Sequence, residues 1–304
     1  MKKIIFSTLL LIAGFSKAQQ DAMFTHYMYN ALWLNPAYAG TRDALTVTGI
    51  HRSQWLGFDG APVDESITLH SPFYQGKMGL GLTIQNDKIG PTRNLFIGAD
   101  YAYQIKLNKK SKLGLGLKAM GVFFNNDVSG LALEDQSQVD AAFGQNYRTV
   151  KPNFGTGVYY YRERFYAGVS TPKLIQNKFG VGGETYEEKR HFYFIMGGVL
   201  NVSSLVKFKP TCFIKATEAA PIQGDMTASF IFRDRLSAGL MYRTGDAAGV
   251  LLGYSFSDQF SIGYSFDWSL ANATGKYNNG SHEIMLRYDL VSISQPKIKS
   301  PRYF

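Results

Sequence analysis

Apolar and polar residues alternate with a period of two along most of the chain. In residues 260–268 (FSIGYSFDW) every second position is apolar or aromatic, and serine, glycine and aspartate stand between them. The stretches 77–85, 235–243 and 282–290 repeat this pattern. Because successive side chains of a β-strand point to opposite faces, each stretch predicts a strand with one apolar face and one face of small and polar residues.

About 14 segments of this kind follow one another, most of them about 9 to 14 residues long. They are residues 44–52, 64–72, 76–86, 93–107, 112–125, 153–162, 164–172, 191–203, 205–217, 221–233, 235–244, 247–257, 259–269 and 281–290. A strand that crosses a membrane needs about 9 to 11 residues, whereas strands of soluble proteins usually have about 5 or 6. The length therefore favours a membrane barrel over a soluble sandwich. In lipid every backbone polar group must be paired, so the strands must close into a ring. The predicted fold class is all-β, a transmembrane outer-membrane barrel of about 14 antiparallel strands.

The connections between these strands are of two kinds. The long ones, residues 53–63, 126–152, 173–190 and 270–280, all follow odd-numbered strands, and the connections after even-numbered strands are short. Outer-membrane barrels have short periplasmic turns and longer extracellular loops. The pattern therefore predicts extracellular long loops, and an even number of strands places both termini in the periplasm.

The first residues have the pattern of a secretory signal peptide. Two lysines precede the apolar run 4–15, and the small residue Ala18 follows it. A membrane anchor would need about 20 apolar residues, so cleavage after Ala18 is the favoured interpretation. The predicted organisation is a signal peptide at 1–18, an N-terminal plug or periplasmic segment at 19–43, the transmembrane barrel at 44–290 and a short periplasmic tail at 291–304.

The stretch ALWLNPAYAG, residues 31–40, does not fit a strand or a long helix. Proline lacks the N–H that a strand ladder needs, and it forces the residue before it into an extended conformation. A ring of this width must be filled or hold water. We predict that residues 19–40 fold into or across the periplasmic mouth of the barrel. The predicted plug residues are Trp33, Leu34, Asn35, Pro36 and Tyr38.

Composition adds few signs of chemistry. The net charge of +9 is scattered along the chain rather than gathered in a stripe, so no nucleic-acid partner is expected. The five histidines and the single cysteine match no metal motif, and no nucleophile motif occurs. A candidate pair for a barrel-wall hydrolase is His70 with Ser66 or with a serine on a neighbouring strand, but the polar lumen face that any barrel has is the favoured explanation of these residues. We predict no catalytic residue, no metal site and no cofactor. Many lumen positions read as Gly, Ser, Thr and Tyr rather than rows of charges.

Six ordered blocks resemble one known family. They are FTHYMYN (24–30), NPAYAG (35–40), HRSQW (51–55), GAPVDESITLHSPF (60–73), GLGLTIQNDKIGP (79–91) and GSHEIMLRYDL (280–290). The chain resembles the PorP/SprF family, outer-membrane proteins of the type IX secretion system of Bacteroidota. The resemblance implies a barrel without enzymatic activity. One branch of the family aids export of a secreted adhesin used in gliding motility and holds it at the surface through the C-terminal domain of this cargo. Another branch is tied to the periplasmic secretion apparatus, and the blocks do not choose between the two.

The expected function is therefore a non-enzymatic barrel that binds a protein partner. Its expected partners are a secreted cargo protein, other type IX secretion components and outer-membrane lipid. The alternative is a diffusion channel or small-molecule transporter of the outer membrane. Arg52 and Trp55 leave the first strand together; Arg52 is expected to pair with an acid inside the barrel and Trp55 to anchor the first loop, unless both are ordinary rim residues. Candidate partner-binding residues in the outer loops are Glu134, Asp135, Tyr147, Arg148, Tyr186 and Arg190.

Overall fold

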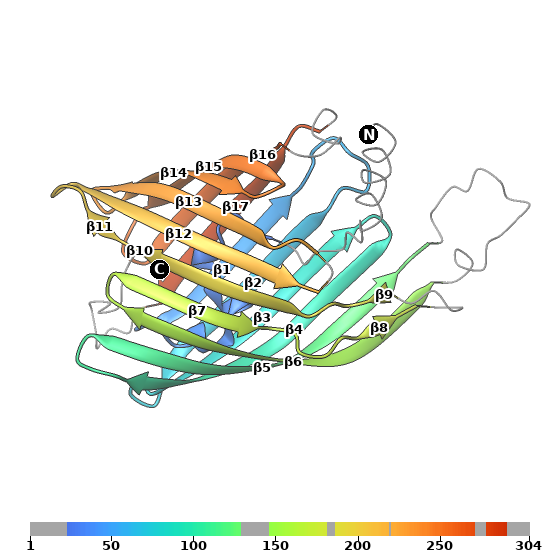
Figure 1. Ribbon diagram of the computed structural model, residues 1–304, viewed down its shortest axis with the longest axis horizontal. Helices are drawn as coiled ribbons and strands as arrows, with labels where there is room; N and C mark the ends of the chain where they lie inside the picture. The colour runs from blue at the N-terminus through green and yellow to red at the C-terminus, as the bar shows by residue number, and fades with distance from the viewer. Residues whose placement is uncertain (1–22, 129–145, 181–185, 219, 271–277, 291–304) are drawn as a thin grey trace, which may run out of the picture.

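The computed structural model is a closed antiparallel β-barrel (Figure 1), and it describes residues 23–128, 146–180, 186–218, 220–270 and 278–290. Each strand pairs with its sequence neighbours, β1 pairs with β17, and the pairing of β10 with β12 completes the ring of 14 strands. The strands of the ring are β1 (Leu45–Ser53), β2 (Val63–Phe73), β3 (Met78–Ile89), β4 (Thr92–Lys106), β5 (Ser111–Asn126), β6 (Tyr147–Arg162), β7 (Phe165–Thr171), β10 (His191–Gly198), β12 (Val206–Thr217), β13 (Gln223–Phe232), β14 (Leu236–Arg243), β15 (Ala247–Ser255), β16 (Phe260–Ser269) and β17 (Ser281–Leu290). The predicted fold class and strand number are confirmed.

Two strand regions differ from the sequence prediction. β6 begins at Tyr147, six residues before the predicted start at 153, and it pairs along its whole length with β5. A separate two-stranded hairpin of β8 (Lys178–Phe179) and β9 (Tyr186–Glu187) lies in the connection predicted as plain loop. The short β11 (Leu200–Asn201) pairs only with β12. Within the described residues, no helix is long and apolar enough to cross a membrane.

The two faces of the wall differ as the alternation predicts. In β17 the side chains of Ile284, Leu286 and Tyr288 are 42–47% exposed on the outer face, whereas Glu283 and Arg287 on the inner face are at most 6% exposed. An apolar outer face suits contact with lipid, because outer-membrane barrels turn a band of apolar side chains towards the membrane. The inner face is buried although no second sheet covers it, so other groups must fill the lumen.

The two rims of the barrel are unlike each other. We call the rim with the connections after β2, β4, β6, β13 and β15 the short-turn end, and the opposite rim the long-loop end. The turn after β2 is tight because Tyr74, Gln75 and Gly76 all have positive φ, a conformation that such turns require. At the long-loop end the β5–β6 hairpin and the β8–β9 hairpin project beyond the rest of the ring (Figure 1). The chain enters β1 from the short-turn end.

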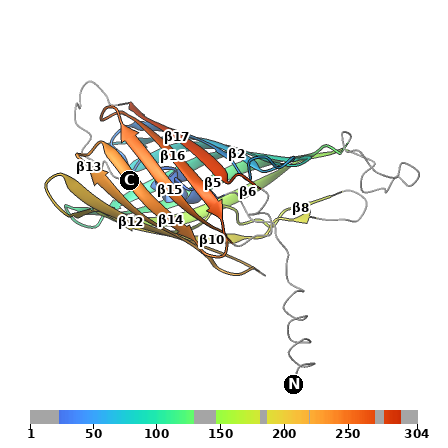
Figure 2. The same ribbon diagram turned by 90° about the horizontal axis from the view of Figure 1, so that it is seen from above.

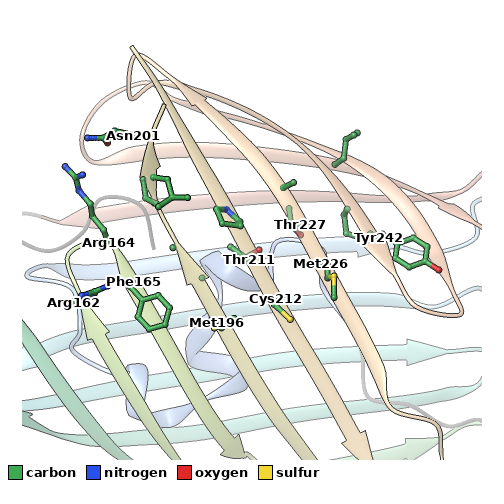
Figure 3. A pocket seen from close by; sticks show the side chains of 18 of the residues that line it. Arg162, Arg164, Phe165, Met196, Asn201, Thr211, Cys212, Met226, Thr227 and Tyr242 are labelled. Atoms are coloured by element: carbon green, nitrogen blue, oxygen red, sulfur yellow. The ribbon is translucent and has the colours of Figure 1, made fainter. Parts of the chain in front are cut away.

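The wall has short strands where β7 pairs with β10, next to β12. β7 has 7 residues and β10 has 8, whereas β5 and β6 have 16 each. The β10–β12 ladder stops at Gly197 opposite Thr211, and the residue of β12 directly before Thr211 is Pro210, which has no N–H to donate. A groove of about 1190 Å³ lies over this part of the wall (Figure 3). Its labelled side chains include Met196, Cys212, Met226 and Tyr242, so it is largely apolar.

Candidate functional site in the barrel lumen

Residues 23–44, which we call the lumen segment, fill the inside of the ring. The segment contains three short helical elements, η2 (Tyr27–Tyr29), α2 (Ala31–Leu34) and η3 (Pro36–Tyr38), seen in blue within the barrel in Figure 2. Trp33 is 2% exposed and Ala37 is fully buried. The segment runs from the level of Arg52, near the long-loop end of β1, down to the short-turn end. It therefore occupies the length of the lumen, whereas the sequence predicted a structure at one mouth.

The first part of the segment is held by a buried carboxylate on the last strand. Glu283 accepts hydrogen bonds from the backbone N–H groups of Thr25 and His26, each at 2.7 Å. Its Oε1 also lies 2.7 Å from His26 Nδ1. Arg52 Nη1 contacts Asp267 Oδ2 at 2.7 Å and Glu283 Oε2 at 3.3 Å. These groups are nearly free of solvent, so each charge depends on its partners for stabilisation.

The middle of the segment packs against several strands at once. Asn30 donates to Ser66 Oγ at 3.0 Å and accepts from Thr68 Oγ1 at 2.8 Å, both on β2. The Trp33 ring lies edge-on to Phe96 of β4, with 5.8 Å between centroids, and Lys118 Nζ of β5 lies 5.4 Å from the same ring. These contacts hold α2 and the residue before it against the part of the wall formed by β2 to β5.

Tyr27 adds a contact with the far wall. Its hydroxyl donates to Thr211 Oγ1 of β12 at 2.9 Å. Burial and, next, the Asp225 carboxylate raise the pKa of Tyr27 well above its ordinary value. The phenol therefore remains protonated and able to donate at any physiological pH.

Asn35 connects α2 and η3 to the wall. Its backbone is extended (φ −141°, ψ 111°), as the following Pro36 predicts. Its side-chain Nδ2 donates to the carbonyls of Val158 at 3.0 Å and Val169 at 3.2 Å, while its Oδ1 accepts from Ala37 N at 2.9 Å. One side chain thus caps η3 and ties it to β6 and β7.

The other predicted lumen residues also face the wall. Leu34, 5% exposed, has a carbonyl that accepts from Ser170 Oγ at 2.7 Å. Pro36 is buried at the start of η3. The Tyr38 ring meets His70 and Tyr159 edge-on, with centroid distances of 5.1 and 5.4 Å.

Glycines in the wall make room for this backbone. A Cβ at Gly116 of β5 would overlap the backbone of Ala37, and one at Gly79 of β3 would overlap the carbonyl of Ala39. Small inward residues were predicted from the alternation, and here they allow backbone to lie directly on backbone.

At the short-turn end the segment is held by a second ion pair. Arg42 donates to both carboxylate oxygens of Asp289, from Nε at 3.1 Å and from Nη2 at 2.7 Å. Thr46 Oγ1 donates to Asp289 at 2.7 Å, and Gln104 Nε2 donates to Ala39 O at 2.9 Å. The lumen segment is thus bonded to strands on several sides of the ring.

The lumen carries more charge than its sequence pattern suggested. Lys118 lies 3.2 Å from Asp100, and Arg243 lies 2.8 Å from Asp225, in both cases inside the barrel. The signal was visible as charged residues at inward positions of the alternation, but the partner of each lies on another strand. Among the described residues, no group of three or more His, Cys, Asp or Glu side chains is placed to hold a metal ion.

The candidate hydrolase pair contacts the lumen segment. Ser66 accepts from Asn30, and His70 Nδ1 accepts from Gly40 N at 3.3 Å. The two side chains stand four residues apart on one strand. This arrangement gives them a role in holding the lumen segment.

The remaining predicted site residues fall in several places. Arg52 is inside the barrel with the acid partners described above. Trp55 is half-buried with a positive φ of 46°. Its backbone N–H donates to Ser281 Oγ at 3.3 Å, which links the first loop to β17. Glu134 and Asp135 lie outside the described residues.

The prediction that residues 126–152 form one outer loop is wrong at its end. Tyr147 and Arg148 belong to β6, because the hairpin with β5 continues beyond the predicted strand and Tyr147 packs on Phe124 with 5.9 Å between centroids. Phe124 also stacks on Phe179 of β8 at 4.8 Å. Tyr186 lies in β9 rather than in plain loop. Arg190 donates twice to the Leu174 carbonyl, at 2.9 and 2.7 Å, so it holds its own connection together.

Comparison with known sequences gives one family. The profile described as "Type IX secretion system membrane protein PorP/SprF" matches residues 16–288. The comparison with curated proteins gives no match.

Solved structures resemble the chain only distantly. The Acinetobacter baumannii outer membrane protein Omp33 gives a TM-score of 0.47 at 10% identity, over 83% of this chain and 100% of that chain. The CymD monoaromatic hydrocarbon channel gives 0.48 at 11% identity, over 86% and 91%. The NanC porin gives 0.43 at 9% identity, over 82% and 100%. Similarity at this level carries no information on what the present chain binds.

Proposed function

Because this chain belongs to the PorP/SprF family of type IX secretion system membrane proteins, we propose that it is a partner-binding barrel rather than a solute channel. The observation that supports this proposal is the occupied lumen. A diffusion channel or small-molecule transporter needs a water-filled path, whereas here residues 23–44 and inward side chains occupy the interior. The same segment serves as a plug that makes the barrel a rigid support.

Displacing this segment would be costly. Glu283 would lose two backbone donors, and Asp289 would lose its partner Arg42. Breaking one buried ion pair typically destabilises a protein by about 3 to 5 kcal/mol. The Arg42–Asp289 ion pair, the hydrogen bonds to Glu283 and the buried Trp33 therefore hold the segment in the lumen.

We assign the partner site to the long-loop end. The β5–β6 and β8–β9 hairpins project there, and the stacked rings of Phe124 and Phe179 join them. A buried ion pair of Lys173 with Glu188, at 2.8 Å, fixes the base of the connection that carries β8 and β9. Rigid projecting loops on a barrel are common binding elements. The side chains of Arg148 and Lys178 are exposed on these hairpins and are available to a partner.

The proposed partner is a secreted cargo protein of the type IX system, such as a surface adhesin used in gliding, held through its C-terminal domain. In this arrangement the signal peptide directs export, the long loops are extracellular, and both termini are periplasmic. A contact of the short-turn end with the periplasmic secretion apparatus is the second arrangement, taken from the other branch of the family. The barrel needs no cofactor and catalyses no reaction in either case.

Two measurements test the proposal. Purified protein in planar lipid bilayers should show no large, sustained open-state current; such a current from the protein alone would contradict the proposal.

The C-terminal domain of the cargo should be retained by the immobilised barrel. Retention should fall in the variant Arg148→Glu/Lys178→Glu and persist in the control Lys110→Glu/Arg162→Glu, which changes the same charges at the short-turn end. The reverse result would move the partner site to that end.

A further inference from the structure

A small cavity remains beside the lumen segment, towards the short-turn end of β12 to β17. Its volume is about 80 Å³, and its walls include Tyr29 and Arg42 of the lumen segment and Lys209 and Arg287 of the barrel. Residues of the turns after β13 and β15, such as Arg235 and Asp258, border it as well, so its outlet is at the short-turn end. Organic ligands occupy pockets of about 300 to 1,000 Å³. This cavity therefore suits one small group.

The charges around the cavity are unbalanced. Arg42 and Lys209 are each 2% exposed, and Arg287 is 6% exposed. Asp289 is the buried carboxylate of this cluster, and Arg42 uses both of its oxygens. The acids at the cavity border, Asp234 and Asp258, stand in exposed turns, and Asp234 pairs with Lys207. The cluster thus places Arg42, Lys209 and Arg287 beside the Asp289 carboxylate, which concentrates positive charge next to the cavity.

Arg287 and Lys209 converge on one aromatic ring. Arg287 Cζ lies 5.0 Å and Lys209 Nζ 4.2 Å from the centroid of the Tyr29 ring. Burial alone would raise the pKa of Tyr29, but the charges of Lys209 and Arg287 lower it below its ordinary value. The positive potential at this place is therefore strong.

The guanidinium of Arg287 carries the most direct sign of a ligand. Its Nε and Nη1 are buried and have no hydrogen-bond partner. More than about 90% of buried polar groups in proteins are hydrogen-bonded, and an exception calls for an explanation such as a bound ion. Guanidinium donors match the two oxygens of a carboxylate or phosphate group.

We propose that this cavity binds an oxyanion, a carboxylate or phosphate group that enters from the short-turn end. Arg287 donates to two of its oxygens, Lys209 supplies a second positive charge, and the hydroxyl of Ser237 in the cavity wall is a third donor. The group comes either from a free ion or from an acidic side chain of a peptide. The inference does not depend on the proposed cargo function.

Titration calorimetry on the full chain in detergent tests the inference, with inorganic phosphate and a short glutamate-rich peptide as separate probes. We expect saturable binding of at least one probe. Arg287→Gln and Lys209→Met should each weaken it about tenfold or more, the effect of losing a charge-assisted hydrogen bond. The control Arg164→Gln, an exposed arginine in the turn after β6, should leave the affinity unchanged.

The two probes separate the sources of the group. Binding of both indicates a site for any oxyanion, and binding of the peptide alone indicates an acidic protein segment. Ser237→Leu fills the cavity without removing a charge and should abolish binding even if the charge variants fold poorly. Unchanged mobility on unheated gels will show that this variant is folded. Absence of saturable binding for both probes, or equal loss in Arg164→Gln, would overturn the inference.

Discussion

At the residue scale, Arg52 shows how a single side chain joins distant parts of the barrel. It leaves β1 towards the lumen and contacts acids on β16 and β17, and one of these acids also holds the backbone of the lumen segment. The sequence analysis predicted that Arg52 pairs with an acid inside the barrel. It could not identify Asp267 and Glu283 as the partners, because more than 200 residues separate them from Arg52 and only ring closure brings them together.

We predict that Arg52→Met strongly destabilises the folded barrel. Asp267 loses its closest cation and Glu283 loses its arginine partner, and both carboxylates remain buried. The expected loss is about 3 to 5 kcal/mol in the free energy of unfolding. Urea unfolding followed by tryptophan fluorescence measures it. Arg93→Met, which removes an exposed arginine from β4, should change the stability by less than about 1 kcal/mol. Equal stability of the two variants would refute the role given to Arg52.

At the scale of elements, the fit between the lumen segment and the glycines of the wall determines whether the lumen is blocked. The alternation predicted small inward residues, and the proline at 36 predicted that residues 31–40 are not a strand. Neither pattern indicated which glycine meets which residue. That depends on the path of an irregular segment, and such a path follows from packing rather than from local propensity.

Gly116→Leu should expel the lumen segment while the ring still forms. The leucine side chain would occupy the space of the Ala37 backbone. The hydrogen bonds of the β4–β5 ladder use only the backbone of residue 116, so the substitution leaves them in place. We expect single-channel currents in planar bilayers and faster protease cleavage within residues 23–44. Gly49→Leu is the matched control, because a Cβ there meets nothing within 4 Å. A Gly116→Leu barrel that conducts no current and resists protease would show that the lumen segment does not fit tightly against residue 116.

The uneven strand lengths predict uneven protection of backbone amides. β7 and β10 are short, and their side of the wall contains Pro210, whereas β5 and β6 pair over 16 residues. Hydrogen–deuterium exchange should therefore be faster in β7 and β10 than in the membrane-spanning parts of β5 and β6. Uniform protection around the ring would contradict this prediction.

At the scale of the whole molecule, strand number and order were predictable from the sequence. A period of two over 14 segments is a repeated signal, and lipid leaves a closed ring as the solution for such strands. The extension of β6 to Tyr147 and the β8–β9 hairpin were missed, because beyond the membrane the strands no longer need an apolar outer face. The charge inside the lumen was underestimated for a different reason. It is arranged in ion pairs whose members lie on different strands, and the sequence pattern of one strand does not reveal such a pair.

The outer apolar band yields a prediction for insertion. Leu117, in the middle of β5, is 62% exposed on the outer face. Leu117→Arg should cost about 2 to 4 kcal/mol of folding stability in lipid vesicles, the cost of arginine near the bilayer midplane. Ile222→Arg changes a residue that is 70% exposed in a connection between strands, and its cost should be near zero. Similar costs at both positions would show that Leu117 does not face lipid.

The carboxylates of β17 have a consequence for how the protein is assembled. β17 is the last strand, and its Glu283 and Asp289 take partners from the first described residues of the chain, including His26 and Arg42. A ring that closed before those residues were in place would leave two carboxylates without these partners. We therefore expect the wall to close most readily when the lumen segment is already in place, so that the final strand favours correct placement of the beginning of the chain.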